Sequence, residues 1–187
     1  LFPYTTLFRS EDLTINTTAA ASSNTVLGLF GVVGNGAVLD KIKLENVDVD
    51  VVSSSNATVE SFIGSLAGIN FGTISNCSVT GNIDAASQYI KIGGLVGVNG
   101  SGSATDAGVI IGCTSGCTIN VTVNNQQGHI GGLVGSSFSI GSAITNCSSS
   151  GTVIGTGGST ENRTGVFSGG LVGYASDTNI TNCISDC

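Results

Sequence analysis

Few of the 187 residues are charged, and several residue types are rare or absent. Met and Trp are missing, Pro and His occur once each, and charged residues make up 9%. Five Lys and Arg stand against 12 Asp and Glu, so the formal net charge is −7. A nucleic-acid interface needs clustered cations to neutralise phosphates, so we expect no nucleic-acid partner. No run approaches the roughly 18 consecutive apolar residues of a membrane-spanning helix, so we expect no membrane span in this segment.

The chain is instead rich in Gly, with 29 residues, and in small polar and aliphatic side chains. Low charge combined with a positive mean hydropathy is atypical of disordered chains. The glycines follow no three-residue period, which excludes a collagen-like structure. The length suits one compact domain or a short repeat array.

Residues 1–10, with the sequence LFPYTTLFRS, match residue for residue the translation of a common sequencing adapter. A secretory signal peptide would begin with cations and continue into an apolar run. Here the only cation, Arg9, lies near the end of the segment. We therefore interpret residues 1–10 as an artefact that is not part of the structure, and residues 11–187 as a single domain.

A Gly-Leu-x-Gly pattern recurs five times along the chain, once with Ser65 in place of the first Gly. Its central leucines are 29 to 38 residues apart, a spacing typical of solenoid repeats. The residues that form the pattern are Gly28, Leu29, Gly31, Leu66, Gly68, Gly94, Leu95, Gly97, Gly132, Leu133, Gly135, Gly170, Leu171 and Gly173.

A second pattern follows each of these segments and consists of an aliphatic residue, a spacer, Asn and Cys. We assign Leu44–Val47 to it in the first repeat, where Val replaces Cys, and Ile110–Cys113 in the third, where Gly replaces Asn. The Asn and Cys positions of the other repeats are Asn76, Cys77, Asn146, Cys147, Asn182 and Cys183.

Apolar and polar residues alternate within the repeats, as in Val47, Val49 and Val51 with Asp48 and Asp50 between them. This period of two predicts half-buried strands. Because one short unit cannot bury its apolar face alone, we expect the units to stack as parallel coils about 4.8 Å apart. The predicted fold is an all-β parallel β-helix, or β-solenoid, of about five stacked repeats with variable loops on one side. We expect the glycines to take positive φ at corners and to let adjacent coils approach closely.

The two patterns together resemble the GLUG-motif repeat of bacterial extracellular proteins, over residues 27–187. The resemblance implies large adhesin-like surface proteins or accessory regions of peptidases that cleave immunoglobulin A, and it implies no catalytic residues. We divide the solenoid into units at about 27–60, 61–91, 92–128, 129–166 and 167–187. Residues 12–16 alternate like the last strand of an earlier unit, and no polar cap is evident, so we expect a fragment open at both ends.

The six cysteines fall into two columns, with Cys117 and Cys187 four residues after Cys113 and Cys183. The favoured interpretation is buried, unbridged thiols that act as small apolar side chains. Two alternatives remain. A disulfide within each CxxxC pair would need a turn between the cysteines, and CxxxC spacing without a nearby His is weak evidence for a metal site.

Other candidate site residues are sparse. His129 precedes a Gly-Gly corner, and we expect it to be exposed in a loop rather than catalytic. Asp48 and Asp50, near Asp40 and Glu45, are candidate Ca²⁺ ligands, but a solvated acidic face is favoured because no calcium-binding loop motif is present.

The sequence therefore favours a non-catalytic repeat module, without metal or cofactor, in a secreted or surface-anchored bacterial protein. Located outside the cell or on its surface, the module would act as an adhesin stalk or as a display surface for a host-surface protein or a glycan. The alternative is an accessory region of a large extracellular peptidase or polysaccharide-degrading enzyme. A weaker alternative is an ice-binding solenoid.

Overall fold

The computed structural model describes residues 8–19, 24–53, 59–103, 105–124, 126–158 and 165–187. All regular structure in these ranges is β-strand, so the all-β prediction is confirmed. The strands are β1 (Phe8–Glu11), β2 (Thr14–Ala19), β3 (Thr25–Leu27), β4 (Phe30–Val33), β5 (Val38–Asp40), β6 (Ile42–Ser53), β7 (Glu60–Gly64), β8 (Ala67–Asn70), β9 (Thr73–Ser75), β10 (Ser78–Ser87), β11 (Tyr89–Gly93), β12 (Val96–Asn99), β13 (Val109–Ile111), β14 (Thr114–Val123), β15 (Gly128–Gly131), β16 (Val134–Thr145), β17 (Ser148–Gly157), β18 (Val166–Gly169), β19 (Val172–Thr181) and β20 (Ile184–Asp186).

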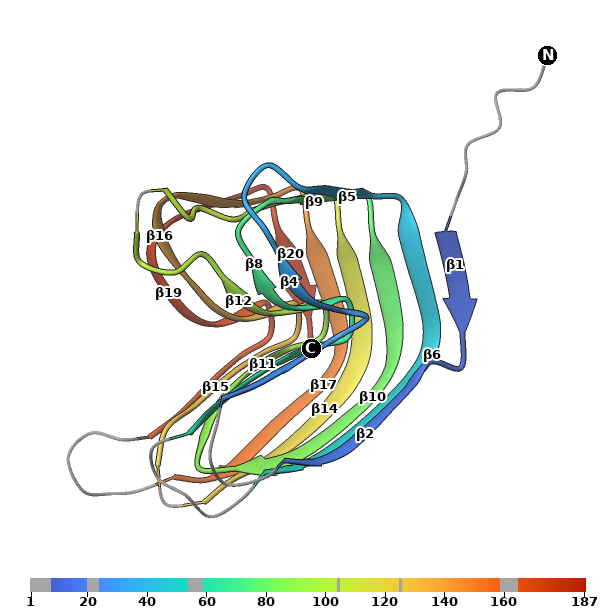
Figure 1. Ribbon diagram of the computed structural model, residues 1–187, viewed down its shortest axis with the longest axis vertical. Helices are drawn as coiled ribbons and strands as arrows, with labels where there is room; N and C mark the ends of the chain where they lie inside the picture. The colour runs from blue at the N-terminus through green and yellow to red at the C-terminus, as the bar shows by residue number, and fades with distance from the viewer. Residues whose placement is uncertain (1–7, 20–23, 54–58, 104, 125, 159–164) are drawn as a thin grey trace.

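The strands form three parallel sheets that run along the stack of coils (Figure 1). Sheet A orders β6, β10, β14, β17 and β20, with β1 and β2 both paired to β6. Sheet B orders β3, β7, β11, β15 and β18, and sheet C contains β4, β5, β8, β9, β12, β13, β16 and β19. Each strand pairs with its counterpart one repeat away, so the predicted parallel β-solenoid is confirmed.

One coil of the solenoid consists of β7, β8, β9 and β10. The chain leaves sheet B, turns at a Gly-Leu-x-Gly corner, crosses sheet C in two short strands and turns again into a long strand of sheet A. The longest connection between the two parts of sheet C is residues 100–108, between β12 and β13. The segments from sheet A back to sheet B also vary, since Gln88 alone separates β10 from β11 whereas residues 124–127 separate β14 from β15.

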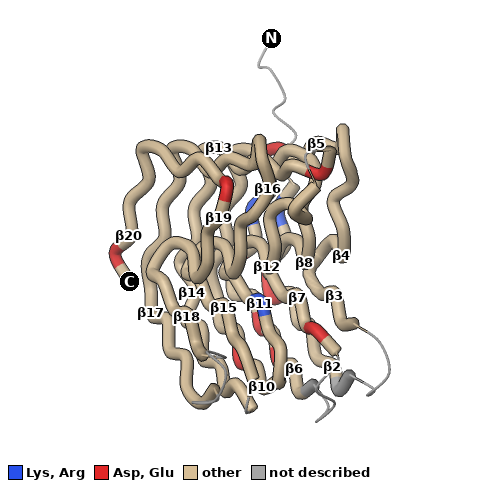
Figure 2. Tube along the Cα trace, turned by 90° about the vertical axis from the view of Figure 1, so that its left-hand side faces the viewer, with Lys and Arg blue, Asp and Glu red and all other residues tan. Residues whose placement is uncertain are grey.

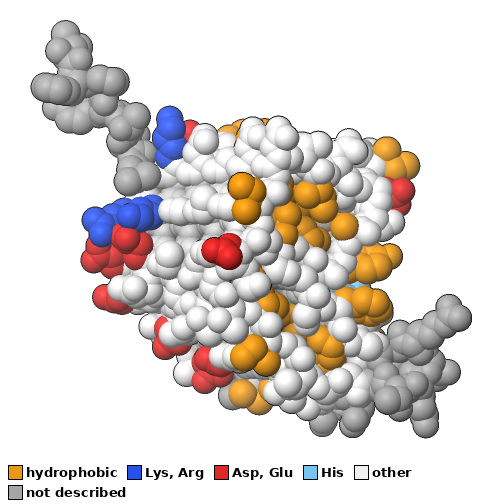
Figure 3. Space-filling model, turned by 180° about the vertical axis from the view of Figure 1, so that it is seen from behind, with side chains coloured by type: hydrophobic (Ala, Val, Ile, Leu, Met, Phe, Trp, Pro, Cys, Tyr) orange, Lys and Arg blue, Asp and Glu red, His pale blue; other side chains and the backbone are white. Residues whose placement is uncertain are grey.

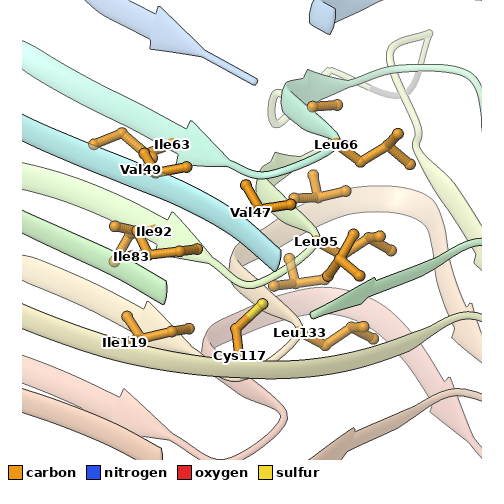
Figure 4. Close-up of a cluster of buried hydrophobic side chains, with 14 of the residues drawn as sticks. Val47, Val49, Ile63, Leu66, Ile83, Ile92, Leu95, Cys117, Ile119 and Leu133 are labelled. Carbon is orange, nitrogen blue, oxygen red and sulfur yellow. The ribbon is translucent and has the colours of Figure 1, made fainter. Parts of the chain in front are cut away.

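The core is a set of apolar columns enclosed by the three sheets (Figure 4). Ile83 pairs with Ile119, which in turn pairs with Val153, so equivalent side chains of successive coils stack on one another. Leu66 and Leu95 are completely buried at the corner between sheets B and C. Fully burying such a side chain contributes about 1.5–3 kcal/mol, so the columns are a main source of stability.

Charged residues are few along the coils, as the blue and red positions on the Cα trace of Figure 2 show. Asp48 and Asp50 are exposed, whereas Val47, Val49 and Val51 are buried, which is the alternation expected of β6. Because Asp48 and Asp50 point away from the core, folding removes little water from their carboxylates.

Residues 8–10 take part in the solenoid, although we interpreted residues 1–10 as lying outside the structure. Phe8 pairs with Ile42, and the Arg9 guanidinium contacts Glu45 at 2.6 Å. The open edge of β6 offers backbone hydrogen-bonding groups that almost any extended segment can satisfy. Residues 8–10 therefore belong to a paired strand, whereas residues 1–7 lie outside the described residues.

The second pattern of the first repeat is shifted from its predicted position. Leu39 pairs with Ile74, so Leu39–Ile42 occupies the corner that we assigned to Leu44–Val47. Lys41 takes positive φ there, at 56°, as Asn76 does in the next coil. Asn46 instead lies at an irregularity in the pairing of β6 with β10, where its N–H donates to the Thr80 hydroxyl at 3.4 Å.

Candidate functional site

The central leucines of the Gly-Leu-x-Gly segments form one column through the solenoid. The Leu66 N–H donates to the Leu95 carbonyl at 3.0 Å, and the Leu95 N–H donates to the Leu133 carbonyl at 2.9 Å. These three leucines are completely buried, whereas Leu29 and Leu171 in the outer described coils are partly buried. The pattern therefore marks the corner at which the chain passes from sheet B to sheet C.

Most glycines of this pattern are required by close packing, although Gly31 has room for a Cβ. A Cβ on Gly97 would lie 2.6 Å from the Ile63 nitrogen, and one on Gly135 would lie 2.5 Å from the Ile92 nitrogen. None of the pattern glycines has positive φ, so the predicted positive φ is wrong for this corner, although Gly112 shows it at the corner between sheets C and A. Their role is to let sheet C cross the backbone of sheet B without steric overlap.

The Asn residues of the second pattern, which stack as one column, have positive φ instead. Asn76, Asn146 and Asn182 have φ of 52°, 54° and 53°, and Gly112 fills the same position with φ of 62°. Asn tolerates the left-handed region better than other residues with a Cβ, and Gly adopts it freely. These residues turn the chain from sheet C into sheet A.

The cysteines that follow form a column without disulfides. The Cys77 N–H donates to Cys113 Sγ and the Cys113 N–H to Cys147 Sγ, each at 3.4 Å. All six cysteines are free, and Cys113 and Cys117 lie within or beside the continuous strand β14, so no turn brings them together. Contacts with the thiols of Cys147 and Cys77, together with burial, raise the pKa of Cys113. Cys187, in contrast to the expectation of buried thiols, is exposed.

A buried polar column lies where sheet C bends, and the sequence did not indicate it. Asn70 Nδ2 donates to Asn99 Oδ1 at 2.8 Å, and Asn99 Nδ2 donates to the Ser137 hydroxyl at 3.1 Å. Asn99 Nδ2 also donates to the Gly108 carbonyl at 2.9 Å. Because its polar groups bond across coils, this column fixes the coil register and the start of the 100–108 connection.

A groove between sheets B and C brings a lysine, a histidine and two aromatic side chains together. Its cavity is about 280 Å³ and is lined by Lys91, Gln127, His129, Phe138 and Tyr174. One wall is the outward column of sheet B, made by Val26, Phe62, Lys91, His129 and Phe167. The facing wall is the column of sheet C made by Val32, Ile69, Val98, Ser136 and Tyr174. Of these two columns, Lys91, His129 and Tyr174 line the cavity itself.

Lys91 is held in this groove by one carboxylate and two rings. Its Nζ lies 2.9 Å from Glu60 Oε1, 4.9 Å from the centroid of Phe62 and 5.8 Å from that of Phe138. The Lys91 side chain is only 18% exposed. The ion pair and the cation–π contacts compensate for part of the lost hydration of the ammonium.

His129 is buried, which corrects the prediction of an exposed loop residue. Its ring stacks on Tyr174 with centroids 4.8 Å apart and contacts Phe167 edge-on at 5.3 Å. Nδ1 lies 2.6 Å from the Ser136 hydroxyl, whereas the buried Nε2 has no hydrogen-bond partner. Burial, followed by the nearby Lys91 charge, lowers the pKa of His129 to about 4, so its imidazole is neutral near pH 7.

A shared sequence position indicates this column of sheet B. Phe62, Lys91, His129 and Phe167 each stand two residues before the Gly that ends a sheet B strand. Aligning that position across the repeats would have placed them in one column. In Figure 3, hydrophobic side chains, coloured orange, gather on one part of the face shown.

The candidate Ca²⁺ ligands do not converge. Asp40 accepts hydrogen bonds from Ser75 and Asn76 of the next coil, and Glu45 pairs with Lys43 and Arg9. The hydrogen bonds from Asn76 and Ser75 lower the pKa of Asp40. Across the described ranges, no three His, Cys, Asp or Glu side chains lie close enough together to hold a metal ion. Nor do those ranges contain a helix that could cross a membrane.

Comparison with known families agrees with the repeat structure. The family model of the GLUG motif matches residues 63–84 and 126–154. The first match runs from the end of β7 into β10, and the second covers β15, β16 and most of β17. No curated protein and no solved structure matches the chain. The chain therefore contains a GLUG-repeat region, which folds as a parallel β-solenoid.

Proposed function

We propose that the chain is a non-catalytic module of a secreted or surface-anchored bacterial protein, in which it serves as an adhesin stalk and display surface. The observation that carries this proposal is that the buried scaffold repeats from coil to coil while the exposed side chains vary. Backbone pairing and buried columns repeat from coil to coil, whereas outward positions of sheet A change from Asp50 to Asp84, Asn120 and Ile154. Such a scaffold can present variable side chains on a stiff support.

The environment of Ser136 and His129 supports a non-catalytic role. Ser136 is fully buried, and it contacts Nδ1 of the imidazole, not the Nε2 that activates Ser in a Ser-His-Asp triad. Glu60, an acid whose charge acts on His129, is already paired with Lys91. Among the described residues around His129, Ser136 is not an accessible nucleophile and Glu60 is not free to orient the imidazole.

An accessory module of a large extracellular peptidase or polysaccharide-degrading enzyme is the second candidate, because the same scaffold would serve it equally well. An ice-binding role is disfavoured, since Asp50, Asp84 and Ile154 interrupt any regular Thr array on sheet A. An assay that detected thermal hysteresis would reverse that judgement.

The reading frame around the chain provides the test. A secretion signal and a wall or outer-membrane anchor in the same frame are expected, together with cleavage of the module by protease added to intact cells. A peptidase or glycosidase domain in the frame would favour the accessory role instead. A frame without any export signal, encoding a protein that is protected in intact cells, would contradict both.

A further inference from the structure

We propose that the groove between sheets B and C is a carbohydrate-binding site, in which a neutral sugar ring lies against Tyr174 and Phe138 and bonds with Gln127 and His129. This inference rests on the proposed display function and assigns it a ligand class. The groove contributes two aromatic rings and three hydrogen-bonding side chains within about 280 Å³. This is close to the lower size of small-ligand pockets, about 300 Å³.

The mixture of lining groups favours an amphipathic ring. Tyr174 is 41% exposed although one of its faces is covered by His129, so it offers apolar surface to a ligand. Phe138 and Gln127 line the same cavity. A pyranose has C–H faces that pack on aromatic rings and hydroxyls at its edge that reach polar side chains, so it matches both kinds of surface.

The unpaired nitrogen of His129 favours a hydroxyl. The residue is 7% exposed, and its Nε2 is buried without a partner. This nitrogen is closed off from solvent in the unliganded structure, so a hydroxyl gains affinity by pairing with it only when the ring moves towards the cavity. Depending on the tautomer, Nε2 either donates or accepts, and a hydroxyl can do both.

The charges in the groove favour a neutral ligand over an anion. The Lys91 ammonium is paired with Glu60 at 2.9 Å, and its remaining contacts are aromatic. The chain as a whole carries a net charge of −7, which repels acidic polymers. Four of the five lining side chains stand on paired strands, and Gln127 directly precedes β15, so the backbone of the site is preformed and little ordering is needed on binding.

The test is a titration of the full chain with neutral oligosaccharides of glucose, mannose and N-acetylglucosamine, followed by amide chemical shifts. Uronic-acid oligosaccharides and aromatic peptides serve as competing ligand classes. At least one neutral sugar is expected to shift residues of β11, β15 and β19 saturably. Tyr174→Ala should weaken that binding at least about tenfold, whereas Tyr174→Phe should retain most of it. Ile154→Ala, an exposed substitution on sheet A, is the matched control.

The proposal is overturned if no neutral sugar shifts these residues, if Tyr174→Ala binds like the unchanged chain, or if only acidic sugars or peptides occupy the groove. Failure of this site and failure of the display function are distinguishable. If the chain binds host surfaces equally well with and without Tyr174→Ala, the groove assignment alone is wrong. If sugars occupy the groove but the protein is not exported, only the proposed function is wrong.

Discussion

The ring of His129 lies nearly parallel to that of Tyr174, with an interplanar angle of 19° and centroids 4.8 Å apart. The contact joins β15 of sheet B to β19 of sheet C, and the Ser136 hydroxyl lies 2.6 Å from Nδ1 of the imidazole. The groove therefore depends on the relative position of two sheets and not on one local segment.

Acid should destabilise the fold through His129. Burial first, and then Lys91, lowers the pKa of His129 from 6.5 to about 4. Between these two values the unfolded chain binds a proton that the folded chain does not, so stability decreases as pH falls from about 6.5 towards 4. Urea unfolding at several pH values should show this decrease. Since carboxylates also titrate near pH 4, the control is His129→Gln, in which the part of the decrease above pH 5 should disappear. Identical pH profiles for the two proteins would contradict the buried, neutral imidazole.

Gly135→Ala should be strongly destabilising. The new Cβ would lie 2.5 Å from the Ile92 nitrogen and 2.7 Å from the Gly97 carbonyl oxygen. Overpacking against backbone costs about 1–3 kcal/mol. Gly34→Ala is the matched control, because its Cβ would meet nothing within 4 Å and its φ is not positive. Chemical denaturation of both variants measures the difference, and equal unfolding midpoints would show that the corner does not need glycine.

At the Asn positions of the second pattern, replacement by Gly should destabilise the fold less than replacement by Ala. Asn146 has φ of 54°, so Asn146→Ala places a residue with a Cβ and no compensating polar group in the left-handed region, at a cost of about 1–2 kcal/mol. Asn146→Gly should be better tolerated, as Gly112 occupies the same position one coil earlier. Asn179→Ala, at an exposed position of β19, controls for loss of the amide. A thermal melt in which the Ala and Gly variants coincide would refute the conformational explanation.

The cysteines should differ sharply in reactivity. Cys187 is exposed and should be alkylated rapidly in the native state, whereas Cys77, Cys113, Cys117 and Cys147 are buried and should react only after unfolding. Peptide mapping by mass spectrometry after brief alkylation, with and without denaturant, gives the order of modification. Rapid native labelling of Cys113, or a disulfide linking it to Cys117, would disagree with the structure.

The scaffold can be predicted from the sequence because each repeat contains the same alternation of apolar and polar residues. The alternation of Val47, Val49 and Val51 defines the inward face of β6, and equivalent positions such as Ile83 and Ile119 pair in register. A parallel stack follows from these two facts, since only neighbouring repeats can cover the apolar face.

The corner of the first repeat was misplaced because its left-handed residue is Lys41 and not Asn. The backbone needs a positive φ at this point, and Asn is the common but not the only solution. Asn46, a better match to the pattern, lies at an irregularity in strand pairing instead. Pairing partners, which a single sequence does not reveal, decide between the two positions.

The burial of His129 could not be predicted from its neighbours in the sequence. Its neighbours Ile130 and Gly131 suggest a corner, but its burial comes from Tyr174 and Phe167 in the following repeat. The groove arises from the packing of sheet C against the outward face of sheet B. No local period encodes that arrangement, so it required the tertiary structure.

The in-register parallel stack is the central claim, and backbone nuclear Overhauser effects measure it most directly. Amide and α-proton contacts should connect Ile83 to Ile119 and Ile119 to Val153, in the pattern of parallel strands. Contacts between adjacent α-protons, which are typical of antiparallel hairpins, or the absence of any contact between these residues would contradict the solenoid.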